Sequence, residues 1–313
     1  VTGTSNRSEV TDFILVGFRV SPELYILLFL LFLPVYAMIL LGNVGMVAII
    51  LSDPRLNTPM CFLLGYLSFI DSIPLLIAPK AMINFWSESK SISFAGVTQL
   101  FLFAIFIVAE GFLLAAMAYN RFIAICNSLL YSIQMSTCLC IQLCPTPIHP
   151  HPMPSYFSGY ISSVLQTSMT FTLSFCASRA IDHFYCDDRP LQRITCSDLY
   201  FHRIVSFPLC SIIILPTIIV ILMSYMYIVS TVLKIRSTEG CKKAFSTCSS
   251  HLGVVSILYG AIFMYFIPDR FPELSKLLSV FYTIFTPLLN PLIYTLRNKE
   301  MKIAMKKLCN HHV

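Results

Sequence analysis

Seven long apolar segments divide this chain, and their length constrains the fold more than any other feature of the sequence. A helix of about 20 residues crosses a hydrocarbon core of about 30 Å. We predict membrane spans at residues 25–51, 59–79, 97–119, 155–176, 204–229, 247–267 and 277–296. Because backbone groups in lipid must pair within their own segment, the sequence predicts an all-α membrane protein, a bundle of seven transmembrane helices.

The composition favours lipid as the solvent of this chain. Of its 313 residues, 57% are hydrophobic and only 12% are charged, whereas a soluble domain carries about 25% charged residues. The strand alternation of an outer-membrane barrel is absent. The net charge of +6 comes without a block of basic and aromatic residues, so we expect no nucleic-acid partner.

An odd number of spans places the two ends of the chain on opposite sides of the membrane. We expect residues 1–24 to be an extracellular N-terminus, because Asn6-Arg7-Ser8 is a glycosylation sequon at Asn6. Residues 25–296 would be the transmembrane domain of a multi-pass plasma-membrane protein. Residues 297–313 alternate lysines with apolar residues, which predicts a short amphipathic helix on the cytoplasmic face.

Two carboxylic acids, Asp71 and Glu110, lie inside the predicted spans. Burying a charged acid in lipid is costly, and no Lys or Arg lies deep in a span to pair with them. We hypothesise a sodium site formed by these two acids, with Asn43 and Asn290 as neighbours. The alternative, a neutral hydrogen-bonded acid, stays open.

Several functional classes find no support in the sequence. There is no nucleophile elbow, metal-ligand helix or phosphate loop, so we do not expect an enzyme. Residues 277–296 hold no lysine for a retinal Schiff base. A transporter should show two related halves, and none is visible, so a channel or transporter remains only a remote alternative.

Seven short motifs occur in order along the spans, at Gly42-Asn43, Leu56 to Phe62, Leu67 to Asp71, Met117 to Cys126, Ser224-Tyr225, Lys243 to Leu252 and Pro287 to Tyr294. Together they resemble the motifs of the olfactory (odorant) receptors, a family of rhodopsin-like G-protein-coupled receptors. Met117 to Cys126 is similar to the family's MAYDRYVAIC, and Lys243 to Leu252 matches KAFSTCxSHL.

The resemblance implies an odorant receptor that binds small, mostly apolar ligands from outside and activates a stimulatory heterotrimeric G protein, which raises cyclic AMP. It implies a cytoplasmic switch. Its predicted residues are Asn120, Arg121, Tyr225, Asn290 and Tyr294. The candidate odorant-binding residues, chosen by position on the third and sixth spans, are Phe103, Ile107, Val108, Tyr259 and Ile262. Bundle packing is an equally good explanation for any one of these five.

The chain also departs from the family pattern. Asn120 replaces an aspartate beside Arg121, so we expect raised basal signalling. The family's cysteine at the outer end of the third helix is missing from Phe94 to Gln99, which would leave Cys186 without its partner, whereas Cys176 and Cys196 can still pair. Losing such a disulfide costs about 2–5 kcal/mol. Together with the proline-rich stretch 145–154, these departures keep a second hypothesis open, a degraded receptor that does not signal.

Overall fold

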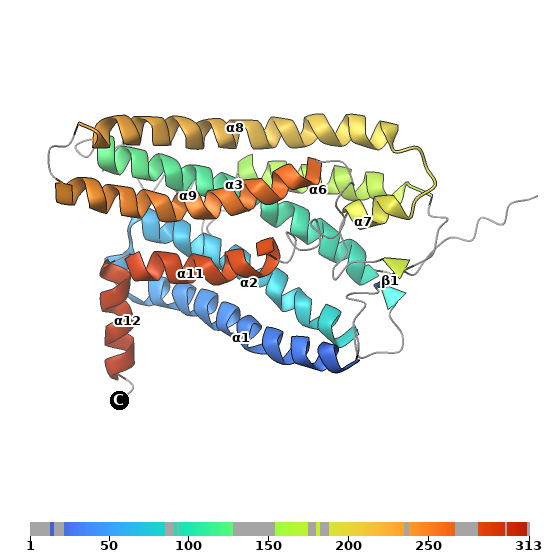
Figure 1. Ribbon diagram of the computed structural model, residues 1–313, viewed down its shortest axis with the longest axis horizontal. Coiled ribbons are helices and arrows are strands. Elements are labelled where there is room, and N and C mark those ends of the chain that lie inside the picture. Colours follow the sequence, from blue (N-terminus) through green and yellow to red (C-terminus); the bar gives the residue numbers. More distant parts are fainter. Residues whose placement is uncertain are drawn as a thin grey trace, which may run out of the picture.

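The computed structural model describes residues 13–15, 22–84, 91–92, 94–127, 154–174, 180–181, 188–234, 238–266, 281–297 and 299–311. Long helices run side by side along the molecule (Figure 1). The long helices are α1 (Pro22–Ser52), α2 (Pro59–Asn84), α3 (Phe94–Cys126), α6 (Pro154–Phe171), α8 (Tyr200–Val232) and α9 (Thr238–Phe266). A π-helical turn, η2 (Phe281–Phe285), leads into α11 (Thr286–Arg297). Each predicted span overlaps one of these helical regions, although several boundaries differ, as at α9, which begins nine residues before its predicted span. The predicted all-α bundle is confirmed.

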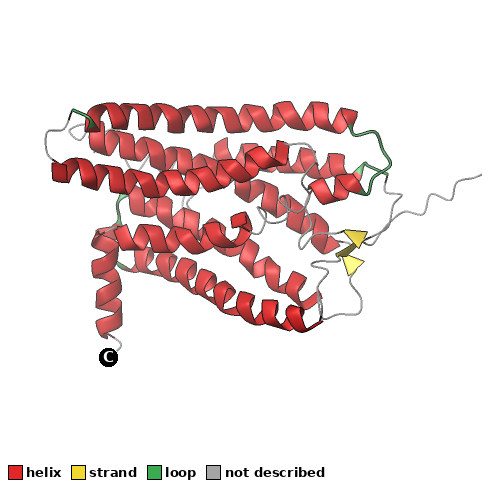
Figure 2. Cartoon of the chain, in the orientation of Figure 1, coloured by secondary structure: helices red, strands yellow, loops and turns green. Residues whose placement is uncertain are grey.

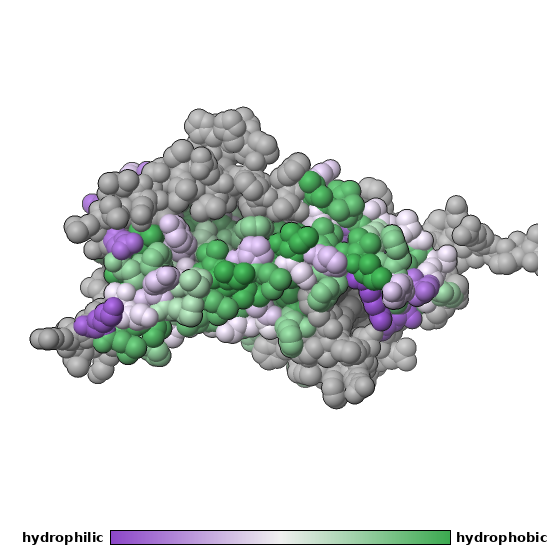
Figure 3. Space-filling view, turned by 90° about the horizontal axis from the view of Figure 1, so that it is seen from above, coloured by the Kyte–Doolittle hydropathy of each residue, from purple (hydrophilic) through white to green (hydrophobic). Residues whose placement is uncertain are grey.

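The described surface is that expected of a bundle in lipid. Three helical stretches among the described residues are long and apolar enough to cross a membrane, namely Leu30–Ser52, Leu100–Cys126 and Tyr200–Val232. Large apolar side chains are exposed along α1 and α8, among them Leu41 and Ile212. On the face drawn in Figure 3, hydrophobic residues occupy the middle and strongly hydrophilic ones lie toward the two ends. Such a surface suits hydrocarbon in the middle and water at both ends.

The third helix is the centre of the bundle. Half of its apolar stretch is buried inside the protein, against 11% of the stretch in α8, and it contacts α2, α6, α8 and α9. Its end corrects one predicted boundary. The predicted span stopped at residue 119, but α3 continues to Cys126, because apolar residues on its last turns still pack against α8. Arg121 therefore lies within the helix and is only 7% exposed.

Prolines shape the seventh span. Pro287 has no N–H to bond the carbonyl of Thr283 four residues earlier, and the π-helical turn η2 lies there. Pro291 likewise cannot bond the carbonyl of Pro287. Asn43 of α1 satisfies that carbonyl instead, since its Nδ2 donates to Pro287 O at 2.9 Å and to Ile39 O at 3.0 Å. Gly42 lets the two helices approach, because a Cβ there would lie 3.3 Å from the Pro291 ring.

The expected amphipathic helix is α12 (Lys299–His311), which runs across one end of the bundle (Figure 1). Met301 and Ala304 are buried in the main core, the cluster of buried apolar residues that includes Leu63, Leu114 and Leu258. Lys302, Lys306 and Lys307 are exposed. A short 3-10 helix, η1 (Pro54–Leu56), lies between α1 and α2 and contacts α12.

A small sheet lies at the opposite end from α12 (Figure 2), and the sequence did not predict it. Its strands are β1 (Phe13–Leu15), β2 (Ser91–Ile92) and β3 (Ala180–Ile181), in the order β2-β1-β3. All three fall outside the predicted spans. The short helix α7 (Asp188–Arg193) lies toward the same end.

Candidate functional site

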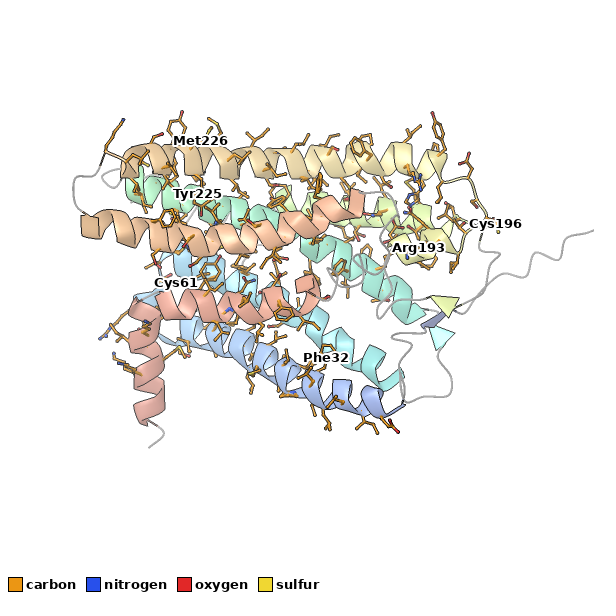
Figure 4. All side chains as sticks on the ribbon, viewed as in Figure 1. Phe32, Cys61, Arg193, Cys196, Tyr225 and Met226 are labelled. Carbon is orange, nitrogen blue, oxygen red and sulfur yellow. The ribbon has the colours of Figure 1, made fainter. Side chains whose placement is uncertain are left out.

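Three of the five predicted switch residues, Arg121, Tyr225 and Tyr294, lie together toward the α12 end of the bundle, where Arg121 is buried. Asn290 instead bonds Asp71 in the middle of the bundle. The Arg121 guanidinium lies close enough to the hydroxyls of Tyr225 of α8 and Tyr294 of α11 to interact electrostatically with both. Tyr225 is 7% exposed and Tyr294 is 4% exposed. Figure 4 places Tyr225 in the half of the molecule toward α12, with Cys61. The structure thus brings three of the predicted switch residues together from three helices.

A buried hydrogen bond closes this end between α8 and α9. The Tyr225 hydroxyl and His251 Nδ1 share a hydrogen bond at 2.7 Å, and Arg121 also acts electrostatically on His251. His251 is fully buried. Although this histidine stands within the matched Lys243 to Leu252 segment, we assigned it no role. A histidine in an apolar span was the available signal, since such a residue needs a polar partner.

Asn120, the residue that replaces the family aspartate, is turned toward α2. Its Nδ2 donates to the Met60 sulfur at 3.3 Å, and its Oδ1 has no hydrogen-bond partner among the described residues. Asn120 is 2% exposed. A neutral amide cannot supply the negative charge that would restrain Arg121, which is the reason for expecting raised basal signalling. That expectation stays a prediction.

The two intramembrane acids lie in the middle of the bundle beside a cavity of about 30 Å³, which has room for one or two water molecules. Its lining residues are Ile70, Asp71, Phe103, Phe106, Ile107, Glu110, Thr283, Thr286 and Pro287. Asn290 Nδ2 donates to Asp71 Oδ2 at 2.8 Å. Asp71 and Glu110 are buried and close enough to repel each other when both are charged.

The donor set of this cavity fits a small hard cation. Thr286 Oγ1, which lines the cavity with the two carboxylates, is a buried oxygen without a hydrogen-bond partner among the described residues. Two more such oxygens, Asn290 Oδ1 and Asn43 Oδ1, belong to side chains that bond the lining residues Asp71 and Pro287. Oxygen ligands are the ones that hard cations prefer. A cation would also cancel the repulsion between the two carboxylates, which a neutral water would not. The residues therefore suit the hypothesised sodium ion.

The five candidate odorant-binding residues do not all face one space. Phe103 and Ile107 line the cavity with the acids. Val108 lies on α3 toward Gly159 of α6, and Ile262 packs against the main core. The Tyr259 hydroxyl donates to Thr217 Oγ1 of α8 at 2.7 Å. The cavity is smaller than the several hundred Å³ of a typical ligand pocket, so the assignment of these residues stays a prediction.

A second polar cluster was not predicted; it lies toward the end of the molecule that carries the small sheet, which we call the strand end. Asp188 of α7 accepts hydrogen bonds from Thr170 of α6 and, at 2.7 Å, from Gln192. His202 of α8 lies 3.7 Å from the same carboxylate, and both side chains are almost fully buried. The cluster joins the loop helix α7 to α6 and α8. Sequence alone did not identify it, because its members are spread from Thr170 to His202, over α6, α7 and α8.

Cys196 is disulfide-bonded, and Figure 4 places it with Arg193 at the strand end of the molecule. Its predicted partner Cys176, the predicted orphan Cys186 and the sequon at Asn6 lie outside the described residues, so the pairing and the glycosylation stay predictions. Cys61 and Cys248 are buried and form no disulfide.

The comparisons with known proteins agree on one family. The family model described as olfactory receptor matches residues 32–311. The chain is 74% identical to human Olfactory receptor 9K2, over 97% of this chain and 90% of that relative. It is 46% identical to human Olfactory receptor OR9H1, over 96% of this chain and 97% of the relative. It is also 46% identical to mouse Olfactory receptor 5AP2, over 98% and 96% of the two lengths.

Proposed function

This chain belongs to the olfactory receptor family, and from that premise we propose that it binds small, mostly apolar odorants from outside and activates a stimulatory heterotrimeric G protein. Members of this family are seven-transmembrane signalling receptors and not enzymes, and the chain is accordingly a multi-pass membrane protein. The second messenger of the proposed pathway is cyclic AMP.

The proposed topology has residues 1–24 outside and residues 297–313 inside the cell. A disulfide at Cys196 suits the oxidising extracellular side. The exposed lysines of α12, at the opposite end, suit the anionic cytoplasmic leaflet. Both residue sets favour the same orientation.

One observation carries the proposal: α3 holds the cavity-lining Phe103 and Ile107 in its outer part and the buried Arg121 near its inner end. Eighteen residues separate Phe103 from Arg121, which is about 27 Å of helix. A rigid helix of that length connects the two faces of a membrane. A G protein cannot reach an arginine that is 7% exposed, so we take the described arrangement as the resting state.

The proposed signal passes through α9. Tyr259 in its outer part bonds Thr217, and His251 two turns further inward bonds Tyr225. An odorant that packs against Tyr259 shifts the outer part of α9, and a shift of this helix breaks the Tyr225–His251 bond. The inner ends of α8 and α9 then separate, and Arg121 is exposed to the G protein. Such a change requires that the odorant bind the open state more tightly than the closed one.

The sodium ion belongs to the same proposal. Asp71 and Glu110 would hold it together with the oxygens of Asn290 and Thr286 in the resting state. A bound cation supplies positive charge between the helices. Because it binds the closed arrangement, it would favour the resting state by mass action.

The test is a cyclic-AMP assay against a panel of odorants in cells whose surface receptor is stained through an N-terminal tag. We expect at least one odorant to raise cyclic AMP in the parent and none to do so in Arg121→Ala stained to the same level. Strong surface staining without any response would sink the proposal in favour of a degraded receptor, which the missing third-helix cysteine supports. A ligand-independent ion current would favour the channel alternative.

A further inference from the structure

The outer end of α3 has no covalent link to the rest of the extracellular face. The sequence contains no cysteine between Cys61 and Cys126, so neither the segment before α3 nor its outer turns can form a disulfide. The loop between α6 and α8 does hold a disulfide-bonded cysteine, Cys196. Only noncovalent contacts can therefore position the start of α3 relative to that loop.

The small sheet connects these two regions. One residue separates the end of strand β2 from the start of α3 at Phe94, and β3 lies between α6 and α7. Strand β1 lies between them and pairs with both. It is antiparallel to β2, with Phe13 opposite Ile92 and Ile14 opposite Ser91. It is parallel to β3, with Ile14 opposite Ala180 and Leu15 opposite Ile181.

The residues of β1 suit a central strand. Phe13 and Ile14 are aromatic and β-branched residues, which are enriched in strands. In a central strand, successive backbone groups bond to the neighbours on either side. Ile14 is paired on both sides, so it is the residue through which the two connections meet.

We propose that β1 is a noncovalent tether, which positions the outer end of α3 against the loop between α6 and α8 and does the work of a missing covalent link. The consequence is a dependence on residues 13–15 that a covalently linked receptor would not have. The outer part of α3 carries Phe103 and Ile107, so the tether also holds the entrance side of the proposed binding region. The proposal does not depend on odorant binding, because it concerns the resting fold.

A pair of engineered cysteines tests the register. In Ile14→Cys with Ser91→Cys, the two residues face each other across the ladder, and their separation suits a disulfide. In Ile14→Cys with Ile92→Cys, the side chains point to opposite faces of the sheet. Both variants share the cysteine at position 14, so any reaction with native cysteines is the same in both. We expect the bridged peptide, measured by mass spectrometry without reduction, in the first variant and not in the second.

A proline substitution in β1 tests whether the receptor depends on this strand. Ile14→Pro removes a backbone N–H from a central strand, whereas Ile14→Val keeps the N–H and the branched side chain. We expect surface receptor to fall by about fivefold or more with proline, which is the factor of one net backbone hydrogen bond, and to stay at the parent level with valine. Val10→Pro, outside β1, is the matched control and should behave as the parent.

The two experiments together decide the proposal. A bridge at 14/91, none at 14/92, and a loss confined to Ile14→Pro would support the tether. Equal bridging in both cysteine pairs, or in neither, overturns it. So does an Ile14→Pro receptor that reaches the surface as the parent does.

Discussion

Substituting Tyr225 by phenylalanine should raise the basal activity of this receptor. The change deletes one hydroxyl, which shares a 2.7 Å hydrogen bond with His251 Nδ1 in a region where both side chains are buried. The ring stays in place, so packing against the surrounding core is kept. What is lost is the polar connection between α8 and α9 in the closed arrangement.

The size of the expected rise in basal activity follows from the burial of His251. Removing one partner and leaving the other buried and unpaired costs about 1–3 kcal/mol, which is about 5–150-fold in an equilibrium constant. If the active state holds about 1% of the receptor at rest, that shift raises it to about 5–60%. Replacing both residues by apolar ones removes the orphaned group, so Tyr225→Phe with His251→Leu should cost less than the sum of the single changes.

The assay is odorant-free cyclic AMP at matched surface expression. Tyr227→Phe is the control, since it deletes the same hydroxyl two residues along α8 at a side chain that is 54% exposed. We expect it to leave basal activity unchanged. Basal activity of Tyr225→Phe equal to that of Tyr227→Phe would refute the reasoning, and a fall would show that the described arrangement is not the resting one.

Three further predictions follow from buried polar groups in the bundle. Asn120→Asp should lower basal cyclic AMP, because it places a carboxylate beside Arg121; equal activity in the two proteins would contradict this. Raising sodium should weaken the odorant response of the parent and leave Asp71→Ala and Glu110→Ala unaffected, and a sodium dependence shared by all three would exclude the site. Asn43→Ala leaves the Pro287 carbonyl unpaired and should cost about 1–3 kcal/mol in thermal unfolding of the detergent-solubilised receptor; an unchanged transition would count against that bond.

The fold was largely predictable, because span length and backbone pairing in lipid leave few alternatives. The apolar runs predicted the seven helical regions, and alternation of lysines with apolar residues predicted α12. Boundaries were less certain. Arg121 fell outside its predicted span because hydropathy drops at a charged residue, although the helix and its packing continue through Arg121.

Contacts between distant segments were not predictable from one sequence. The motifs identified Tyr225, but its hydrogen bond to His251 depends on how α8 and α9 pack. The bond from Asn43 to Pro287 spans 244 positions, and its reason, a carbonyl left unpaired by Pro291, appears only when the two helices are side by side. Strand β1 has three residues, too few for a periodic pattern to reveal.

The central claim is that odorant binding opens the closed inner end of the bundle, and the native Cys248 of α9 reports on it directly. This free cysteine is 6% exposed and packs with Ala115 and Ala118 of α3, whereas Cys61 of α2 is 1% exposed and lies outside the moving part. The measurement is the maleimide labelling rate of each cysteine, by mass spectrometry, with and without an activating odorant and G protein. The account predicts faster labelling of Cys248 with Cys61 unchanged; a Cys248 rate that does not respond to the odorant and G protein would contradict it.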